Sequence, residues 1–200
     1  MIVFRSLLAL SALGVVALAA DAPAPKIISQ PALTGPLGSE WSVAKGKWEP
    51  KEGVLYGTDL PEEHHAAVLH LATGPTALAF ECEFRFATAR SFLIGCDGNR
   101  HVGRIIATPK GVKLAEDSTE VKGKSPSHVL AEAKADFSPS EWHHLRLEYR
   151  EDRLSLKLDS TDLTAQHPYL ATPKTRWWFA VGGGTAEIRN VKVSVLETKP

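Results

Sequence analysis

The sequence predicts an all-β protein, a two-sheet antiparallel β-sandwich of jelly-roll type. Apolar residues recur at every second position in most segments, which is the period of a strand with one buried face. Turn signals follow at intervals of about ten residues, and no segment has a convincing helical pattern. Strands of this kind are buried by packing two sheets together, so we expect ten to twelve short strands in two layers.

The clearest alternation runs from Ala77 to Ala87, where apolar residues alternate with Glu81, Glu83 and Arg85. The run from Ser91 to Asp97 alternates in the same way, and folding the chain back about Ala89 matches its apolar residues with those of the first run. The sequence therefore predicts a hairpin whose facing pairs are Phe86 with Phe92, Phe84 with Ile94, and Cys82 with Cys96.

A second hairpin is predicted around Glu151 and Asp152, which fit a two-residue loop. Its facing pairs are Tyr149 with Leu154, Leu147 with Leu156, and Leu145 with Leu158. A proline turn at 108–111 pairs Ile105 with Leu114 and Ala107 with Val112, and a turn at 49–53 joins Trp48 to the strand 54–57. The Ala-rich segment 129–137 also alternates, so we expect a strand there and not a helix. Strands at 176–181 and 187–196 close the chain.

The domain organisation follows from composition. Residues 1–20 have one charge, Arg5, then an apolar run and small residues at Ala17 and Ala19, which is typical of a secretory signal peptide. The apolar run of about 13 residues is shorter than the roughly 20 that span a bilayer. Residues 21–39 are a Pro- and Ala-rich linker or extended arm, and residues 40–197 form the domain. We expect a secreted or periplasmic protein that does not associate with a membrane once the signal is cleaved.

The charge balance excludes one class of partner. The chain has 23 Lys plus Arg against 23 Asp plus Glu, and removing the signal leaves 22 against 23, a net charge of −1. A chain this neutral has no general electrostatic attraction for nucleic acid, which we exclude as a partner.

The two cysteines, Cys82 and Cys96, face the core on strands predicted to be adjacent, and disulfides persist outside the cytoplasm. Directly opposed strand residues have Cβ atoms about 4.5–5.5 Å apart, which is longer than the roughly 3.8 Å that a disulfide prefers. A Cys82–Cys96 disulfide and two buried free thiols both remain open.

Several segments together resemble one family: the W-x6-W-x4-G-x-L-x-G pattern of 41–57, the strand 80–86, the segment His101-Val102-Gly103-Arg104, and 141–159 beginning Glu-Trp-His-His. They are similar to the secreted concanavalin A-like domains, once a domain of unknown function, that are named for 3-keto-disaccharide hydrolase. That family is abundant in Planctomycetes and Verrucomicrobia and is related to glycoside hydrolase family 16 and laminin-G-type jelly rolls. The resemblance covers Trp41 to Leu196, with Asp159-Ser160 where members often have Asp-Gly. It implies a concanavalin A-like jelly roll and a role in binding carbohydrate or hydrolysing a modified disaccharide.

Candidate catalytic residues are sparse. The family 16 pattern Glu-x-Asp-x-x-Glu is absent, and the nearest feature is the pair Glu81 and Glu83 on one strand face, with Arg85 following. Residues two apart on a strand have Cα atoms roughly 6.5–7 Å apart, within the range that an acid–base pair of a glycosidase needs. The alternative is a solvated strand face without chemistry.

Candidate ligand-binding residues are Arg85, Trp178, and the pair His101 and Arg104, which a bulge at Gly103 would bring to one face. His101 is alternatively a hydrogen-bonded core histidine. Trp177 and Trp178 are consecutive, so one points inward and the other outward, where it either stacks on a sugar ring or forms plain surface.

Metal signals are weak. Adjacent histidines on a strand point to opposite faces, so neither His64-His65 nor His143-His144 chelates alone, and no histidine spacing matches a known zinc or copper site. A histidine site would form only if the fold brought together distant members of the set His65, His70, His101, His128, His144 and His167. We expect no transition metal and no cofactor, apart from calcium at Asp97-Gly98-Asn99 as the one candidate.

The sequence therefore predicts an exported sandwich that binds or processes carbohydrate, with hydrolysis of a (3-keto-)disaccharide as the enzymatic version. The alternative is a non-catalytic carbohydrate-binding module or a cell-surface adhesion or scaffold module.

Overall fold

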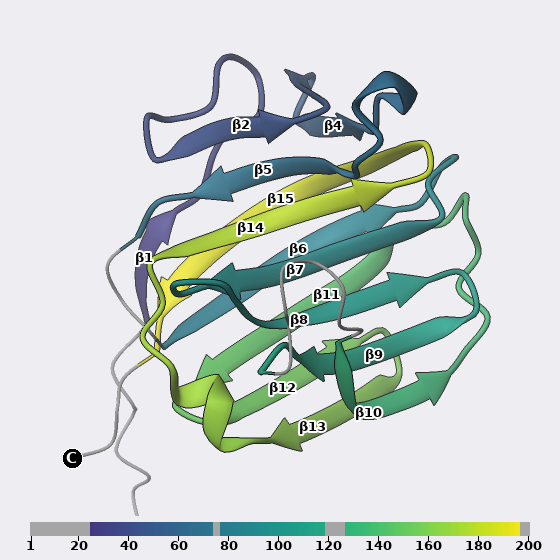
Figure 1. Cartoon of the computed structure of the whole chain (residues 1–200). Coiled ribbons are helices and arrows are strands. Elements are labelled where there is room, and N and C mark those ends of the chain that lie inside the picture. Colours follow the sequence, from purple (N-terminus) through teal and green to yellow (C-terminus); the bar gives the residue numbers. More distant parts are fainter. Residues whose placement is uncertain (1–24, 74–76, 119–126, 197–200) are drawn as a thin grey trace, which may run out of the picture.

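The computed structural model describes residues 25–73, 77–118 and 127–196. In these residues fifteen β-strands and two short 3-10 helices form two antiparallel sheets that pack face to face (Figure 1). The predicted all-β sandwich is confirmed, with more strands than we expected. No helix of the described residues is both long enough and apolar enough to cross a membrane.

Sheet A has eight strands in the order β13-β12-β11-β6-β15-β4-β3, with β1 pairing to β15 outside this path. Its strands are β1 (Lys26–Ser29), β3 (Lys47–Lys51), β4 (Val54–Thr58), β6 (Leu78–Arg85), β11 (His143–Arg150), β12 (Arg153–Leu158), β13 (Thr161–Gln166) and β15 (Thr185–Val195).

Sheet B has seven strands in the order β10-β9-β8-β7-β14-β5-β2. They are β2 (Trp41–Lys45), β5 (Ala67–Leu71), β7 (Ser91–Asp97), β8 (His101–Thr108), β9 (Gly111–Glu116), β10 (His128–Lys134) and β14 (Arg176–Gly182). The helix η1 (Pro61–Glu63) precedes β5, and η2 (Pro168–Ala171) follows β13.

The local hairpins have the predicted registers. In β11 and β12, Leu145 pairs with Leu158, and Tyr149 pairs with Leu154. β8 and β9 pair Ile105 with Leu114, as the proline turn predicted, and β3 pairs with β4. Short turns therefore specified these three hairpin pairings.

The Ala-rich segment is a strand over His128–Lys134, where it forms the edge of sheet B.

The hairpin predicted around Ala89 does not form. β6 belongs to sheet A, between β11 and β15, whereas β7 belongs to sheet B, between β8 and β14. The two strands instead pack against each other across the core, where the ring centroids of Phe84 and Phe92, a pair that the hairpin did not predict, lie 4.6 Å apart. Alternation identified the buried residues correctly and could not distinguish a neighbouring strand from the opposite sheet.

The same crossing excludes the disulfide. Cys82 is on β6 and Cys96 on β7, and both are buried free thiols. Packed sheets lie about 10 Å apart, beyond the roughly 7 Å between Cα atoms that a disulfide can span. Burial raises the pKa of the Cys96 thiol to about 12, so it is not reactive.

The core between the sheets is aromatic. Phe80 of sheet A contacts Trp177 and Phe179 of sheet B, with ring centroids 5.2 and 6.2 Å apart. Trp177 is completely buried, as are Phe84 and Phe92. This continuous core is what makes the two outer faces rigid platforms.

The expected linker is partly structured. Lys26–Ser29 forms β1, which pairs with the end of β15, and Leu33 is buried. The segment from Lys26 therefore belongs to the folded domain and is not a free tether there. The predicted signal peptide, residues 1–20, lies outside the described residues.

Candidate functional site

The predicted site residues lie on two different sheets. Glu81, Glu83 and Arg85 are on β6 of sheet A, while His101 and Arg104 are on β8 of sheet B. Because their side chains point away from the core, the two groups face opposite sides of the sandwich. His101 and Arg104 therefore do not share a pocket with the two glutamates. Each outer face has to be considered separately.

Sheet A presents rows of charged side chains across its outer face. Neighbouring strands place unlike charges beside each other, because Glu83 pairs in register with Arg189 of β15 and with His144 of β11. The next row runs from Lys192 through Glu81 to Arg146. The polar positions of three adjacent strands, β15, β6 and β11, thus form one continuous surface.

A hollow of about 310 Å³ lies in the middle of this surface. Its polar lining consists of the carboxylates of Glu81, Glu83 and Asp159 and the donor groups of Arg146, Lys157, Asn190 and His144. We call this the sheet A hollow. It contains both predicted catalytic glutamates, and the other lining residues come from β11, β12, β15 and the β12–β13 turn.

Glu83 is held by three neighbours. Arg189 Nε and Asn190 Nδ2 each donate to a different carboxylate oxygen at 2.7 Å, and His144 Nδ1 lies 3.9 Å away. Desolvation raises the pKa of Glu83, but the hydrogen bonds from Asn190 and Arg189 outweigh it and the pKa is lowered. Glu83 is therefore an ionised acceptor at neutral pH.

Asn190 was not predicted from the sequence. The register between β15 and β6 shifts between Arg189 and Lys192, which is the mark of a β-bulge, and Asn190 has a positive φ of 53°. The bulge lets two successive residues, Arg189 and Asn190, reach the same glutamate. Strict alternation cannot anticipate this, although asparagine is one of the residues that tolerate positive φ.

Glu81 is bound by cations. Arg146 Nη1 donates to its Oε1 at 2.6 Å, and Lys192 Nζ lies 3.0 Å from the same oxygen. Glu148 accepts from Arg146 on the other side, so these groups form an extended ion-pair network. The arrangement holds the side chains in defined positions along the edge of the hollow.

Arg85 lies beside the hollow and takes part in a stack of side chains. Its Nε donates to Glu187 at 2.8 Å, and its guanidinium lies 5.0 Å from the ring centroid of Trp142. Arg189 covers the same ring at 4.0 Å. Trp142 is half-buried beneath these two guanidinium groups, which is a cation–π arrangement.

On sheet B the central group is Asp97, which is only 3% exposed. His101 Nδ1 and Trp178 Nε1 lie 2.7 and 2.8 Å from its Oδ1, and Arg176 donates to its Oδ2 at 2.6 and 3.0 Å. Desolvation raises the pKa of Asp97, but these hydrogen bonds outweigh it and lower the pKa to about 2. The carboxylate is bound by protein donors on both oxygens, so this position does not suit the calcium that the sequence allowed there.

Trp178 is oriented outward yet buried. It is 5% exposed, its ring lies across Gly95, and His101 and Arg104 contact it at 5.7 and 5.8 Å. The expected open platform for a sugar ring is therefore wrong at this position. His101 is hydrogen-bonded, as one alternative predicted, but it lies at the surface and not in the core.

Arg104 completes the sheet B network. It forms a bidentate ion pair with the buried carboxylate of Asp117, through Nε at 3.1 Å and Nη2 at 2.5 Å. Its guanidinium is thus used to neutralise a buried charge. The network from Asp117 through Arg104 and Trp178 to Asp97 is structural in character, and the sheet A hollow is the better candidate for ligand binding.

Comparisons with known proteins identify the fold. The sequence matches no known family profile and no curated protein. The structure is similar to the carbohydrate-binding module CBM66 from Bacillus subtilis, with a TM-score of 0.62, 16% identity, and coverage of 78% of this chain and 95% of that one. It is also similar to a Bacillus licheniformis β-glucanase, with a TM-score of 0.63, 9% identity, and coverage of 86% and 99%.

A third similar structure is the exoplasmic/lumenal domain of VIP36 in its Ca²⁺/Man3GlcNAc-bound form, with a TM-score of 0.57, 12% identity, and coverage of 80% and 85%. Identities this low establish a shared fold and nothing finer. The chain is a concanavalin-like jelly roll, and membership of the 3-keto-disaccharide hydrolase family stays a prediction.

Proposed function

We propose that this chain is an exported carbohydrate-binding protein and that the sheet A hollow holds the sugar. The observation that carries the proposal is the mixture of groups around the hollow. Carboxylates that only accept hydrogen bonds alternate there with guanidinium, ammonium and amide groups that donate them.

Sugar hydroxyls suit such a surface because each one both donates and accepts hydrogen bonds. A hydroxyl beside the Glu83–Asn190 pair or the Glu81–Arg146 pair would find an acceptor and a donor on neighbouring residues, because the carboxylates keep further lone pairs and the amide and guanidinium keep further N–H groups. Trp142 packs beneath Arg85 and Arg189 and so supports Arg189, which donates to Glu83. The ion pairs hold these groups in place before a ligand binds, which lowers the entropy cost of binding.

The comparisons support the same proposal by analogy. The similar structures include a carbohydrate-binding module and a domain solved with Man3GlcNAc. One fold supports many different functions, so the similar structures only support the proposal. Its main evidence is the set of residues around the hollow.

Binding is favoured over hydrolysis at the predicted pair. A glycosidase needs one carboxylic acid with a raised pKa to protonate the leaving group. Glu83 has a lowered pKa, and Glu81 is neutralised by Arg146 and Lys192. Glu83 is therefore unsuited to act as the acid, and both carboxylates already have basic partners, so we assign the pair to ligand binding and not to acid–base catalysis of a (3-keto-)disaccharide.

The test is a binding screen followed by matched variants. Purified protein is screened on an array of oligosaccharides and polysaccharides that includes 3-keto-disaccharides, and the best ligand is titrated by calorimetry. Glu83→Gln should weaken binding about tenfold, since a hydrogen bond to a charged group contributes about 1.5–3 kcal/mol. Lys113→Ala, at an exposed position of sheet B, is the control and should bind like the parent.

Two outcomes would contradict the proposal. One is that no glycan binds. The other is that Glu83→Gln and Arg146→Gln both bind as tightly as the parent, which would place the ligand elsewhere. Release of monosaccharide from a disaccharide, lost in Glu83→Gln, would instead favour the hydrolase.

Export is tested separately. Mass spectrometry of the protein recovered outside the cytoplasm should show a chain that begins near Asp21, whereas an intact Met1 in that fraction would contradict cleavage.

A further inference from the structure

Glu116, at the end of β9, is the least exposed acidic side chain of the described residues, with 1% of its surface accessible. The other two buried acids, Asp97 and Asp117, each have an arginine partner. Within the part of the chain that the structure describes, the charged partners of Glu116 are two imidazoles, those of His128 and His167. An imidazole is cationic only when protonated, so among the described residues this buried carboxylate has no permanent positive neighbour.

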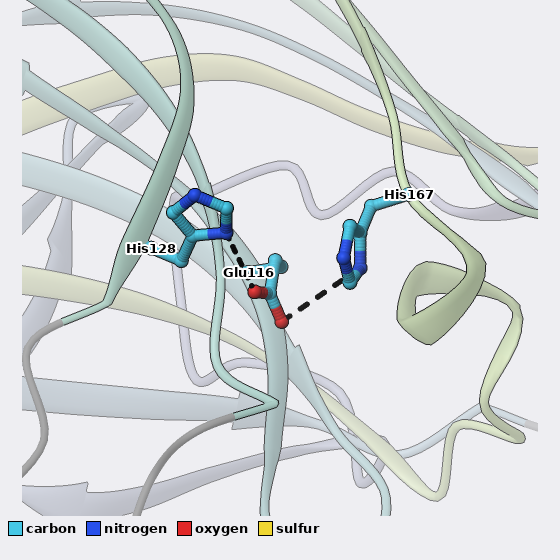
Figure 2. A group of neighbouring side chains, drawn as sticks. All are labelled: Glu116, His128 and His167. Atoms are coloured by element: carbon cyan, nitrogen blue, oxygen red, sulfur yellow. Dashed lines mark hydrogen bonds and ion pairs between the residues drawn. The ribbon is translucent and has the colours of Figure 1, made fainter.

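The three residues come from three separate elements. Glu116 ends β9 and His128 begins β10, both in sheet B, while His167 follows β13 at the edge of sheet A. Figure 2 shows the two rings on either side of the carboxylate. His128 Nδ1 lies 3.1 Å from Oε1 of Glu116, and His167 Nδ1 lies 3.9 Å from Oε2.

One ligand atom from each residue lies within 4.8 Å of the others. In a tetrahedral zinc site with ligands at about 2.0–2.1 Å, the ligand atoms are roughly 3.4 Å apart. Side-chain rotations that move the ligand atoms by about an ångström would therefore bring the three atoms to the spacing of a zinc site. His128 is largely exposed, which gives an ion access to the carboxylate from solvent.

We propose that Glu116, His128 and His167 bind a divalent transition-metal ion of the zinc class. Two imidazoles and one carboxylate are a ligand set that zinc uses, with water as the fourth ligand. Imidazole nitrogen does not suit calcium or magnesium, which take oxygen ligands. The ion supplies a permanent positive charge, which no described residue provides to the buried carboxylate.

The hydrogen bonds of Glu116 leave room for this role. The amide and the hydroxyl of Ser118 donate to Glu116, and a carboxylate has about four acceptor positions, so capacity remains for a metal. His167 Nδ1 caps η2 by accepting from the amide of Tyr169 at 3.3 Å. A neutral imidazole has one acceptor nitrogen, so a metal bound to His167 replaces this long hydrogen bond.

The site also has a structural consequence. β10 is the edge strand of sheet B and β13 is the edge strand of sheet A. A metal held by His128 and His167 would connect these two edges. Since the ion binds the folded chain, it stabilises the fold in proportion to its occupancy.

The experiment uses untagged protein, stripped of metal with a chelator and dialysed. Zn²⁺ and Co²⁺ are added separately, the bound metal per chain is measured by elemental analysis, and Tm is followed by circular dichroism. We expect one ion per chain and, at free Zn²⁺ about 100 times its Kd, a Tm higher by roughly 5–10 °C. Ca²⁺ and Mg²⁺ should leave Tm unchanged.

Variants locate the ion. His128→Ala, an exposed position, should keep the metal-free Tm and lose both the stoichiometric ion and the Tm increase, and His167→Ala should lose them too. His65→Ala, at another exposed histidine, should behave like the parent. The proposal is overturned if the parent retains no Zn²⁺ at micromolar concentration, or if His128→Ala and His167→Ala bind it as the parent does.

Discussion

The outer faces of the two sheets are built from the same kinds of residue and use them differently. On sheet B, Trp178, Arg104 and Asp97 are bound to one another, and both the tryptophan and the carboxylate are buried. On sheet A, Trp142 is half-buried under two guanidinium groups, and the acids and bases surround a hollow.

This difference separates stability from binding. Polar groups that bind one another in a buried network have little left for a ligand, and removing one leaves its partner unpaired. Groups around a partly exposed hollow contribute less to stability, because water replaces a lost partner, and they remain accessible. We therefore expect variants of sheet B to damage the fold and variants of sheet A to damage binding.

The largest expected effect is that of Trp178→Ala. It removes a buried ring that packs across Gly95, so we expect a loss of about 3–5 kcal/mol in the free energy of unfolding, measured by urea denaturation. Trp142→Ala is the matched variant on sheet A. It loses two cation–π contacts worth about 0.5–1 kcal/mol each and should be clearly less destabilised. Equal losses of unfolding free energy in the two variants would contradict the expected difference between the two sheets.

The next effect is that of pH on Asp97. The folded pKa of about 2 lies below the ordinary value of 3.8, so ionised Asp97 stabilises the fold above about pH 4. This contribution is lost as the pH falls from about 4 towards 2. Asp97→Asn should lower the free energy of unfolding at pH 7 by about 2 kcal/mol, at 1.36 kcal/mol per pKa unit.

Urea titrations at several pH values provide the measurement. The difference between parent and Asp97→Asn should shrink below pH 4, as the parent loses the same interaction. A difference that is constant from pH 7 to pH 2 would mean that the ionised form of Asp97 is not what stabilises sheet B.

The smallest expected effect on stability is that of Glu83→Gln. Its ion pair with Arg189 lies at the surface, and such pairs contribute up to about 1 kcal/mol. The same variant carries the largest expected effect on glycan binding. A loss above about 3 kcal/mol in urea denaturation would show that the sheet A surface is structural after all.

The sequence predicted inward and outward positions well and spatial neighbours poorly. The hairpin of β11 and β12 was predicted in register because a two-residue loop joins strands that pair with each other. Glu81 and Glu83 were correctly placed on an outward face, but Asn190 reaches them only through a bulge in β15, which alternation does not encode.

The cluster at Glu116 shows the same limit. Its members lie at positions 116, 128 and 167, a spacing that matches no zinc motif. The adjacent pairs His64-His65 and His143-His144, which are conspicuous in the sequence, are not part of this cluster. His143 instead bonds Asp159 and the carbonyl of Ser138 in the interior. The spacing of residues along the sequence does not show which distant strands and turns come together in the fold.

The sequence by itself determined which strand side chains point into the core, because a period of two assigns each residue of a strand to one face or the other. Only the tertiary structure decided which sheet each strand joins. Phe84 is buried equally well beside a neighbouring strand or opposite one, so the choice depends on hydrogen bonds from β6 to β11 and β15, which are distant in the chain. That choice put Glu83 and Arg104 on opposite sides of the molecule.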